Sequence, residues 1–212
     1  MRYEDQRALL VSDLSREGIL DQKVLAAFAK VPRENYVLPE YREYAYRNSP
    51  LPIELQQTIS QPLMIAIMLQ LLELQPEDTV LEIGTGSGYQ SALLAELVKT
   101  VCTVERLDRL SLSAQKVLKT AGYKNIHFRI GDGSRGWEKA YPPYKEFAKI
   151  IVSAGAESIP PAIVNQLAEG GRLVIPVGHS QIQELYLVQR KEAKIISSIC
   201  GACSFVPLIV DN

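Results

Sequence analysis

The stretch "TVLEIGTGSGYQSALLAEL", residues 79–97, combines an acid with closely spaced glycines. A short apolar run ends in Glu82, and glycines then stand at alternate positions: Gly84, Gly86 and Gly88. This order is typical of a strand, a glycine loop and a helix. Glycines let a backbone approach a ligand closely, and the first turn of a helix offers free N–H groups. The loop, which includes Thr85, is therefore a candidate site for a nucleotide-like ligand.

Acids also stand where the next two predicted strands end. Glu105 lies 21 residues after Gly84 and closes the second strand, and the "GDG" after the third strand supplies Asp132 and Gly133. An acid after the second strand of such a fold can bind two ribose hydroxyls, and Asp132 would lie near an adenine amino group. Together with Glu82, these acids suit a positively charged ligand that carries a ribose. S-adenosylmethionine has a sulfonium, an ammonium, a ribose diol and an adenine, and we predict that it binds here.

Two other interpretations of the loop remain open. The glycines could simply make a tight turn, with the acids as solvated loop ends. Alternatively, the protein could be an NAD-dependent oxidoreductase. Tyr89 stands where the G-x-G-x-x-G fingerprint has its third glycine, and Glu82 would lie beside the pyrophosphate of a dinucleotide. Both features disfavour a dinucleotide, and a titration with NADH would test it.

Strand-like and helical runs alternate around these motifs. The predicted strands are 79–83, 100–105, 126–130, 148–153 and 172–177, and the helices between them are 88–98, 109–121 and 158–168. Two further strands, 184–190 and a C-terminal run that reaches Val206, follow without a long helix between them. The pattern predicts an α/β fold with a mostly parallel seven-stranded sheet, helices on both faces and an antiparallel edge.

The first third of the chain has a different character. Residues 1–30 have helical spacing, residues 31–58 hold four prolines and four tyrosines without a clean period, and a helix is expected from residue 62 to Leu74, before Pro76. We predict one domain in which a helical and irregular segment precedes and covers an α/β core; the boundaries are 1–75 and 76–212.

The carboxyl edge of the sheet needs a cover, because helices occupy its two faces. In an open α/β sheet the ligand lies at this edge. Chain from outside the alternating core must therefore roof it. We expect residues 31–60 and the closing "FVPL", residues 205–208, to do so.

Composition excludes several classes of protein. The 212 residues have a formal net charge of −1 and a pI near 6.2, so no basic excess indicates nucleic acid. The longest apolar stretch, residues 63–74, is interrupted by Gln70 and Glu73 and is shorter than the roughly 20 residues of a membrane span. Only three cysteines occur, and the first residues do not resemble a signal peptide. We expect a cytoplasmic protein that binds neither nucleic acid nor membranes.

Several motifs resemble those of the protein-L-isoaspartate O-methyltransferase family. "KVLAAFAKVPRENYV" and "AYRNSPLPI" match its amino-terminal region, and "QTISQPLM" matches its signature ahead of the glycine loop. "VLEIGTGSGYQSALLA", "GDG", "IPPAIVNQLAEGGRLVIPVG" and "FVPL" follow in the family order. The glycine loop is common to many methyltransferases, whereas "TISQP" and "FVPL" at these distances are much more specific.

The resemblance implies a Rossmann-like methyltransferase that uses S-adenosylmethionine, releases S-adenosylhomocysteine and needs no metal. Its substrates would be proteins or peptides with L-isoaspartyl residues, whose methyl ester closes to a succinimide and thereby begins repair. Ser60 corresponds to the residue regarded as the active-site serine, and Thr58 and Ile59 would lie over the cofactor. Residues 31–60 and "FVPL" would then form a groove for a peptide. The resemblance also implies a monomer.

Some local features leave alternatives open. Ser60 could be the N-cap of the helix that contains Pro62 in its first turn. The family usually has glycine before "QTIS", where this chain has Glu54 and Leu55, and usually has Asp where this chain has Ala148. The altered loop leaves open a non-catalytic binding module that retains the cofactor site as a relic.

Other motifs are expected to have no catalytic role. "CGAC", residues 200–203, has redox spacing but lies in a predicted strand, and "YPPY", residues 141–144, lacks the leading Asp or Asn of nucleic-acid methyltransferases. His127 and His179 are far apart in the sequence, and we expect Trp137 to be a packing residue.

Overall fold

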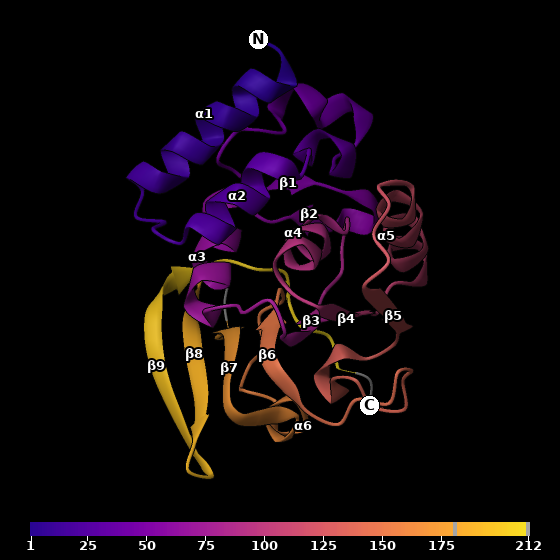
Figure 1. Ribbon diagram of the computed structural model, residues 1–212. Helices are drawn as coiled ribbons and strands as arrows, with labels where there is room; N and C mark the ends of the chain where they lie inside the picture. The colour runs from indigo at the N-terminus through magenta and orange to yellow at the C-terminus, as the bar shows by residue number, and fades with distance from the viewer. Residues whose placement is uncertain (180–181, 211–212) are drawn as a thin grey trace.

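Buried apolar strands separated by helices form one seven-stranded sheet (Figure 1). The computed structural model describes residues 1–179 and 182–210. The strand order is β5-β4-β3-β6-β7-β8-β9. The strands are β3 (Thr79–Ile83), β4 (Thr100–Glu105), β5 (Ile126–Ile130), β6 (Phe147–Val152), β7 (Leu167–Val177), β8 (Gln183–Lys191) and β9 (Lys194–Cys203).

The direction of the strands confirms the predicted sheet. The pairs from β5 to β7 are parallel, whereas β7–β8 and β8–β9 are antiparallel. After β3 the chain builds β4 and β5 on one side and then returns to place β6 on the other side of β3. The carboxyl ends of β3 and β6 therefore form a switch point, where ligands bind in open α/β sheets.

Two hydrophobic clusters lie on opposite faces of the sheet because successive strand residues point to opposite sides. Val80 and Val174 pack with the larger helices, and Leu81 and Leu173 pack with Ile163 on the other face. The helices are α1 (Tyr3–Arg16), α2 (Gln22–Lys30), α3 (Pro62–Leu72), α4 (Tyr89–Leu97), α5 (Asp108–Thr120) and α6 (Pro161–Asn165). Helices thus cover both faces, as predicted.

The segment expected to be irregular contains short, regular pieces. Between α2 and α3 lie three 3-10 helices and a small antiparallel pair of strands: η1 (Arg33–Tyr36), η2 (Pro39–Tyr44), β1 (Leu51–Pro52), η3 (Glu54–Gln56) and β2 (Thr58–Ile59). In Figure 1 these pieces lie with α1 and α2 above the carboxyl edge of the sheet. A further 3-10 helix, η4 (Gly133–Arg135), follows β5.

Three boundaries predicted from the sequence are wrong. The strand expected over 172–177 begins earlier, at Leu167. The helix expected over 158–168 spans only Pro161–Asn165, because the N–H of Phe147 binds the carbonyl of Gln166 and Leu167 already pairs with Phe147 in β7. The last strand ends at Cys203 and not at Val206. Beyond it the chain crosses to the end of β6, where the carbonyl of Val206 accepts from the N–H of Gly155 at 2.8 Å.

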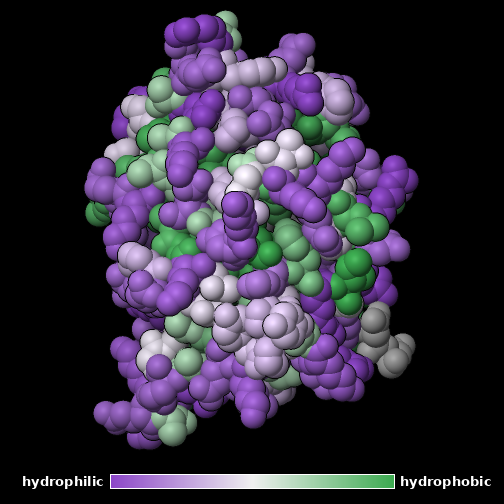
Figure 2. Space-filling model, turned by 45° about the vertical axis from the view of Figure 1, so that its right-hand side comes forward, coloured by the Kyte–Doolittle hydropathy of each residue, from purple (hydrophilic) through white to green (hydrophobic). Residues whose placement is uncertain are grey.

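The outer surface has no single large apolar area on the side that Figure 2 shows. That side is mainly hydrophilic, with hydrophobic residues in small separate patches. Within the described residues, every helix is too short or too polar to cross a lipid bilayer.

Candidate active site

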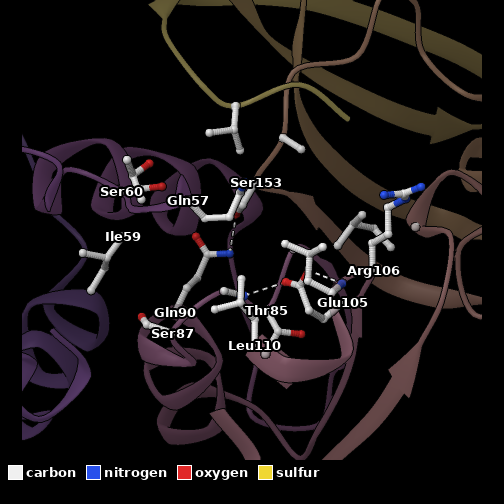
Figure 3. Close-up of a pocket in the computed structure, with 18 of the residues that line it drawn as sticks. Gln57, Ile59, Ser60, Thr85, Ser87, Gln90, Glu105, Arg106, Leu110 and Ser153 are labelled. Carbon is white, nitrogen blue, oxygen red and sulfur yellow. Dashed lines mark hydrogen bonds between the residues drawn. The ribbon is translucent and has the colours of Figure 1, made fainter. Parts of the chain in front are cut away.

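A cavity of about 280 Å³ lies at the carboxyl ends of β3, β4 and β6 (Figure 3). One side, here called the glycine-loop wall, consists of lining residues from 83–90, 104–110 and Gly133. The other side, the cover wall, consists of lining residues from 55–60 and 206–209. Segments almost 150 residues apart in the chain therefore meet here, as expected for the roof of the sheet edge.

The glycine loop is shaped by the sheet beneath it. The N–H of Gly84 binds the carbonyl of Val104 at 2.9 Å, and Gly84 has φ of +95°, a conformation that favours glycine. Gly88 serves packing, since an added Cβ would lie 3.0 Å from Leu118 and 3.2 Å from Ala114 on α5. Tyr89 then begins α4 and is buried at the cavity wall.

Glu105 joins β4 to the glycine loop. Its Oε2 accepts from the N–H of Gly86 at 2.9 Å, and its Oε1 accepts from the N–H of Leu107 at 3.0 Å. The side chain lines the cavity and is only 7 % exposed. Each carboxylate oxygen can accept a further hydrogen bond. Glu105 is therefore held at the wall with acceptor capacity to spare.

Glu82 does not line the cavity, contrary to the expectation of a direct ligand contact. Its carboxylate is fully buried beneath α4 and accepts from Nε2 of Gln90 at 3.0 Å and from Oγ of Ser91. Burial raises the pKa of Glu82 to about 7, and the donors oppose part of this rise. Gln90 also donates to Oγ of Ser153 at 2.8 Å, and both of these residues line the cavity. A hydrogen bond to Thr103, which in turn contacts the hydroxyl of the lining residue Thr85 at 2.6 Å, gives a second link. Glu82 therefore reaches the site through other side chains and not directly.

Asp132 also lies behind the wall. Its Oδ1 accepts from the N–H of Ser134 at 2.8 Å and its Oδ2 lies 3.7 Å from Nε of Arg135, whereas the neighbouring Gly133 lines the cavity. An added Cβ on Gly133 would lie 2.4 Å from Cγ2 of Ile83, so this close approach requires glycine. Of this pair, Gly133 therefore forms part of the cavity surface and Asp132 does not.

Ser60 lines the cavity together with Thr58 and Ile59 (Figure 3). The alternative that Ser60 caps α3 is wrong, because Gln61 is the N-cap residue and has no side-chain capping bond. Oδ1 of Asn48 instead accepts from the N–H of Leu63 at 3.0 Å. Asn48 is a distant residue that the local pattern could not single out.

The loop before Thr58 adopts left-handed backbone at two residues that are not glycine. Leu55 has φ of +57° and Gln56 has φ of +59°. The carboxylate of Glu54 pairs with Nε of Arg109 on α5 at 2.9 Å. This chain therefore lacks glycine at a point of the loop where the backbone conformation favours glycine.

Sequence reasoning missed several polar residues that line the cavity. Gln90, Ser153 and Arg106 line the cavity but were not singled out. A signal was available, because Ser153 and Arg106 directly follow β6 and β4, and Gln90 is a polar residue in the first turn of an apolar helix.

The motifs set aside lie apart from this site. Cys200 and Cys203 are free thiols on β9, His127 is in β5, and none of these residues or His179 lines the cavity. The described residues contain no cluster of side chains suited to a metal. Trp137 is buried and its Nε1 donates to the carbonyl of Pro142 at 2.7 Å, so it packs as expected.

Comparison with known proteins places the chain in a family. The family model described as protein-L-isoaspartate(D-aspartate) O-methyltransferase matches residues 5–212. The protein-L-isoaspartate O-methyltransferase of Dictyoglomus turgidum is 47% identical over 207 residues, which cover 98% of this chain and 92% of the relative. That of Vibrio vulnificus is 46% identical over 207 residues, which cover 98% of this chain and 97% of the relative. A solved structure from Plasmodium falciparum, described as a putative protein-L-isoaspartate O-methyltransferase in complex with S-adenosyl-L-homocysteine, matches with a TM-score of 0.84 and 26% identity over 99% of both chains. The chain therefore belongs to the protein-L-isoaspartate(D-aspartate) O-methyltransferase family.

Proposed function

We propose that the protein transfers a methyl group from S-adenosylmethionine to the free carboxylate of L-isoaspartyl residues in damaged proteins and peptides. The observation that carries this proposal is the cavity that the glycine loop shares with Ser60 and the C-terminal segment 206–209, in a chain that matches the family along nearly its whole length. The ester formed would close to a succinimide and so begin repair.

The residues of the glycine-loop wall fit S-adenosylmethionine. Gly84, Thr85 and Gly86 present a short turn of backbone to the amino-acid part of the ligand, and Glu105 has free acceptor positions for two ribose hydroxyls. Gly133 would lie against the adenine, with Asp132 behind it. The solved relative with S-adenosyl-L-homocysteine supports the same cofactor here.

The chemistry needs little from the side chains. Of the described residues that line the cavity, only Glu105 and Arg106 carry a charge, so no histidine or lysine is at hand as a general base. None is required, because an isoaspartyl carboxylate is already ionised at neutral pH and is itself the nucleophile. The cofactor supplies an electrophilic methyl group on its sulfonium.

The protein would contribute alignment and dehydration. We assign to Ser60 a hydrogen bond to one oxygen of the substrate carboxylate, which leaves the other oxygen free to attack. Thr58 and Ile59 would separate the reacting groups from water, together with Pro207 and Leu208 of the C-terminal segment. A site of this kind gains rate from proximity and orientation more than from acid or base catalysis.

Normal aspartate should be a poor substrate. The groove between 55–60 and 206–209 would hold the peptide backbone, and an aspartyl carboxylate is one methylene nearer to that backbone than an isoaspartyl carboxylate. The test is methylation of two synthetic peptides that differ only in this linkage. Methylation of the isoaspartyl peptide alone supports the function. Equal methylation of both peptides, or methylation of free dicarboxylic acids, would indicate a methyltransferase without the repair role. Methylation of neither peptide would favour a non-catalytic binding module that retains the cofactor site.

We also propose that the protein acts as a cytoplasmic monomer and as one domain, with 1–75 covering the core 76–212. The free cysteines suit a reducing compartment, and the first hydrophobic cluster includes residues from both parts, such as Leu14 and Val174. Light scattering on the purified protein tests the oligomeric state, and a mass close to 23.6 kDa is expected.

A further inference from the structure

Arg33 in η1 is completely buried, which is rare for an arginine. Its Nε donates to the carbonyl of Ala45 at 2.9 Å, and its Nη2 donates to the carbonyl of Ser60 at 2.8 Å. The guanidinium also lies over the ring of Tyr89, with Cζ 4.8 Å from the ring centroid. One side chain therefore contacts the residue that follows η2, Ser60 two positions before α3, and the first residue of α4.

The guanidinium retains its charge in this environment. Burial lowers the pKa of Arg33 to about 10, which still leaves it protonated at neutral pH. The face of an aromatic ring attracts a cation and offsets part of the lost hydration. The ring of Tyr89 is itself fixed by Phe28 and Tyr36, whose centroids lie 6.1 Å and 5.5 Å from its own. Arg33 is thus held on a rigid platform at the start of α4.

The two residues that Arg33 joins belong to opposite walls of the cavity. Tyr89 follows the glycine loop and Ser60 is part of the cover wall, while Arg33 lies behind both and does not line the cavity. The side chain of Ser60 makes no capping bond to α3. Since a serine has one χ angle, a fixed backbone at Ser60 restricts the direction of its hydroxyl to a few staggered positions.

We propose that Arg33 is a positioning residue, which holds the backbone of Ser60 against the start of α4 so that the Ser60 hydroxyl meets the substrate carboxylate beside the cofactor. The inference rests on the proposed function and adds a residue to it. Lysine cannot replace Arg33 fully, because one ammonium lacks the planar fork that reaches two carbonyls while stacking on a ring.

Arg7 provides a matched control in the same layer of the molecule. It is partly buried, donates to the carbonyls of Ala29 and Lys30, and lies 3.8 Å from the carboxylate of Glu34. Its Cζ is 6.0 Å from the ring centroid of Tyr46. These contacts resemble those of Arg33 in kind but do not include Ser60 or Tyr89.

The experiment compares Arg33→Lys, Arg7→Lys, Ser60→Ala and the double variant Arg33→Lys/Ser60→Ala in the full-length protein. The readouts are thermal unfolding, the Kd for S-adenosylhomocysteine by calorimetry, and kcat and KM for an isoaspartyl peptide. We expect Arg33→Lys to lower kcat at least fivefold while KM and Kd change less than twofold. Arg7→Lys should leave kcat within twofold, and the double variant should match Ser60→Ala within twofold, because Arg33 acts through Ser60.

Several outcomes would overturn the positioning role. They are an unchanged kcat in folded Arg33→Lys, an equal loss in Arg7→Lys, or losses that multiply in the double variant. If Arg33→Lys does not fold, Tyr89→Leu removes the ring on which the guanidinium stacks. Its effect on kcat is then compared with that of Ser60→Ala and of the double variant Tyr89→Leu/Ser60→Ala. A wild-type protein that methylates no isoaspartyl peptide refutes the proposed function as well, whereas an active wild type with unaffected variants refutes only the role of Arg33.

Discussion

The two walls of the cavity are built in different ways. In the glycine-loop wall, residues with positive φ are glycines and the backbone is bonded to the neighbouring strand. The carboxylates of Glu82 and Glu105 each accept from at least two donors. In the cover wall, Leu55 and Gln56 adopt left-handed backbone without glycine, and β2 has two residues and pairs with the equally short β1.

The difference follows from what each wall must recognise. A cofactor has one shape, so its wall can be an extension of the rigid sheet. Damaged proteins present many different sequences around one altered linkage, and a wall mounted on short elements can adjust to them. The cover wall still needs one fixed point, and we assign this to Ser60. Four predictions test the contrast, in order of decreasing effect.

The largest effect concerns the buried carboxylate beneath the glycine-loop wall. Burial raises the pKa of Glu82 from 4.5 to about 7, so the folded protein binds this proton more firmly than the unfolded chain. The contribution of protonated Glu82 to the free energy of unfolding is fully present below pH 4.5 and is lost as the pH rises through 7. The loss amounts to about 3 kcal/mol. Urea unfolding at pH 5 and pH 8 should show this decrease for wild type relative to Glu82→Gln, and parallel curves for the two proteins would contradict it.

Glu105→Ala should weaken binding of S-adenosylhomocysteine at least tenfold by calorimetry. Loss of a hydrogen bond to a charged group typically costs about 1.5–3 kcal/mol, and the N–H groups of Gly86 and Leu107 also lose their acceptor. Glu54→Ala is the comparison, since it breaks a solvent-accessible ion pair with Arg109 next to the cover wall and should change the Kd less than twofold. Equal effects of the two variants would remove the distinction between the walls.

Ser60→Ala should lower kcat about tenfold, while the Kd for S-adenosylhomocysteine stays nearly constant, because the lost contact acts mainly in the transition state. Its free energy of unfolding should change by less than about 0.5 kcal/mol, as expected away from a cap. Asn48→Ala should do the reverse, with a loss of about 1 kcal/mol in stability because Asn48 caps α3. Normal turnover per folded molecule of Ser60→Ala would withdraw the catalytic assignment.

The smallest effect is expected at Leu55. Glycine relieves left-handed strain there but adds freedom to the unfolded chain, so Leu55→Gly should leave the free energy of unfolding unchanged or raise it by up to about 1 kcal/mol. Leu112→Gly makes the same exchange on the exposed side of α5 and should cost about 1 kcal/mol. Chemical denaturation compares the two, and a loss at Leu55 as large as that at Leu112 would show that the loop is not strained.

The sheet was predictable because its inner strands are buried on both faces and appear as continuous apolar runs. The bounds of β3, β4 and β5 agree with the sequence, and so does the antiparallel edge. The helix near residue 160 was overestimated because pairing of Leu167 with Phe147 is a contact between distant residues that local periodicity does not contain.

The positions of the acids show a second limit. Glu105 lies at the end of its strand and lines the cavity. Glu82 is one residue short of the end of β3 and shares the face of Val80, so it points beneath α4. Motif spacing identified both acids but did not resolve on which side of the sheet each one falls. The cap of α3 was missed for a related reason, because Asn48 approaches it from another segment.

The cavity that residues 58–60 share with 206–209 also affects how the protein assembles. Contacts between such distant parts of a chain require closure of a long loop and tend to form late in folding. The parallel sheet from β3 to β7 can therefore be complete while the catalytic cavity is still open on one side. Local opening of the crossing at Gly155 and Val206 would likewise abolish activity without unfolding the sheet, so loss of turnover should precede loss of secondary structure as the protein ages or is heated.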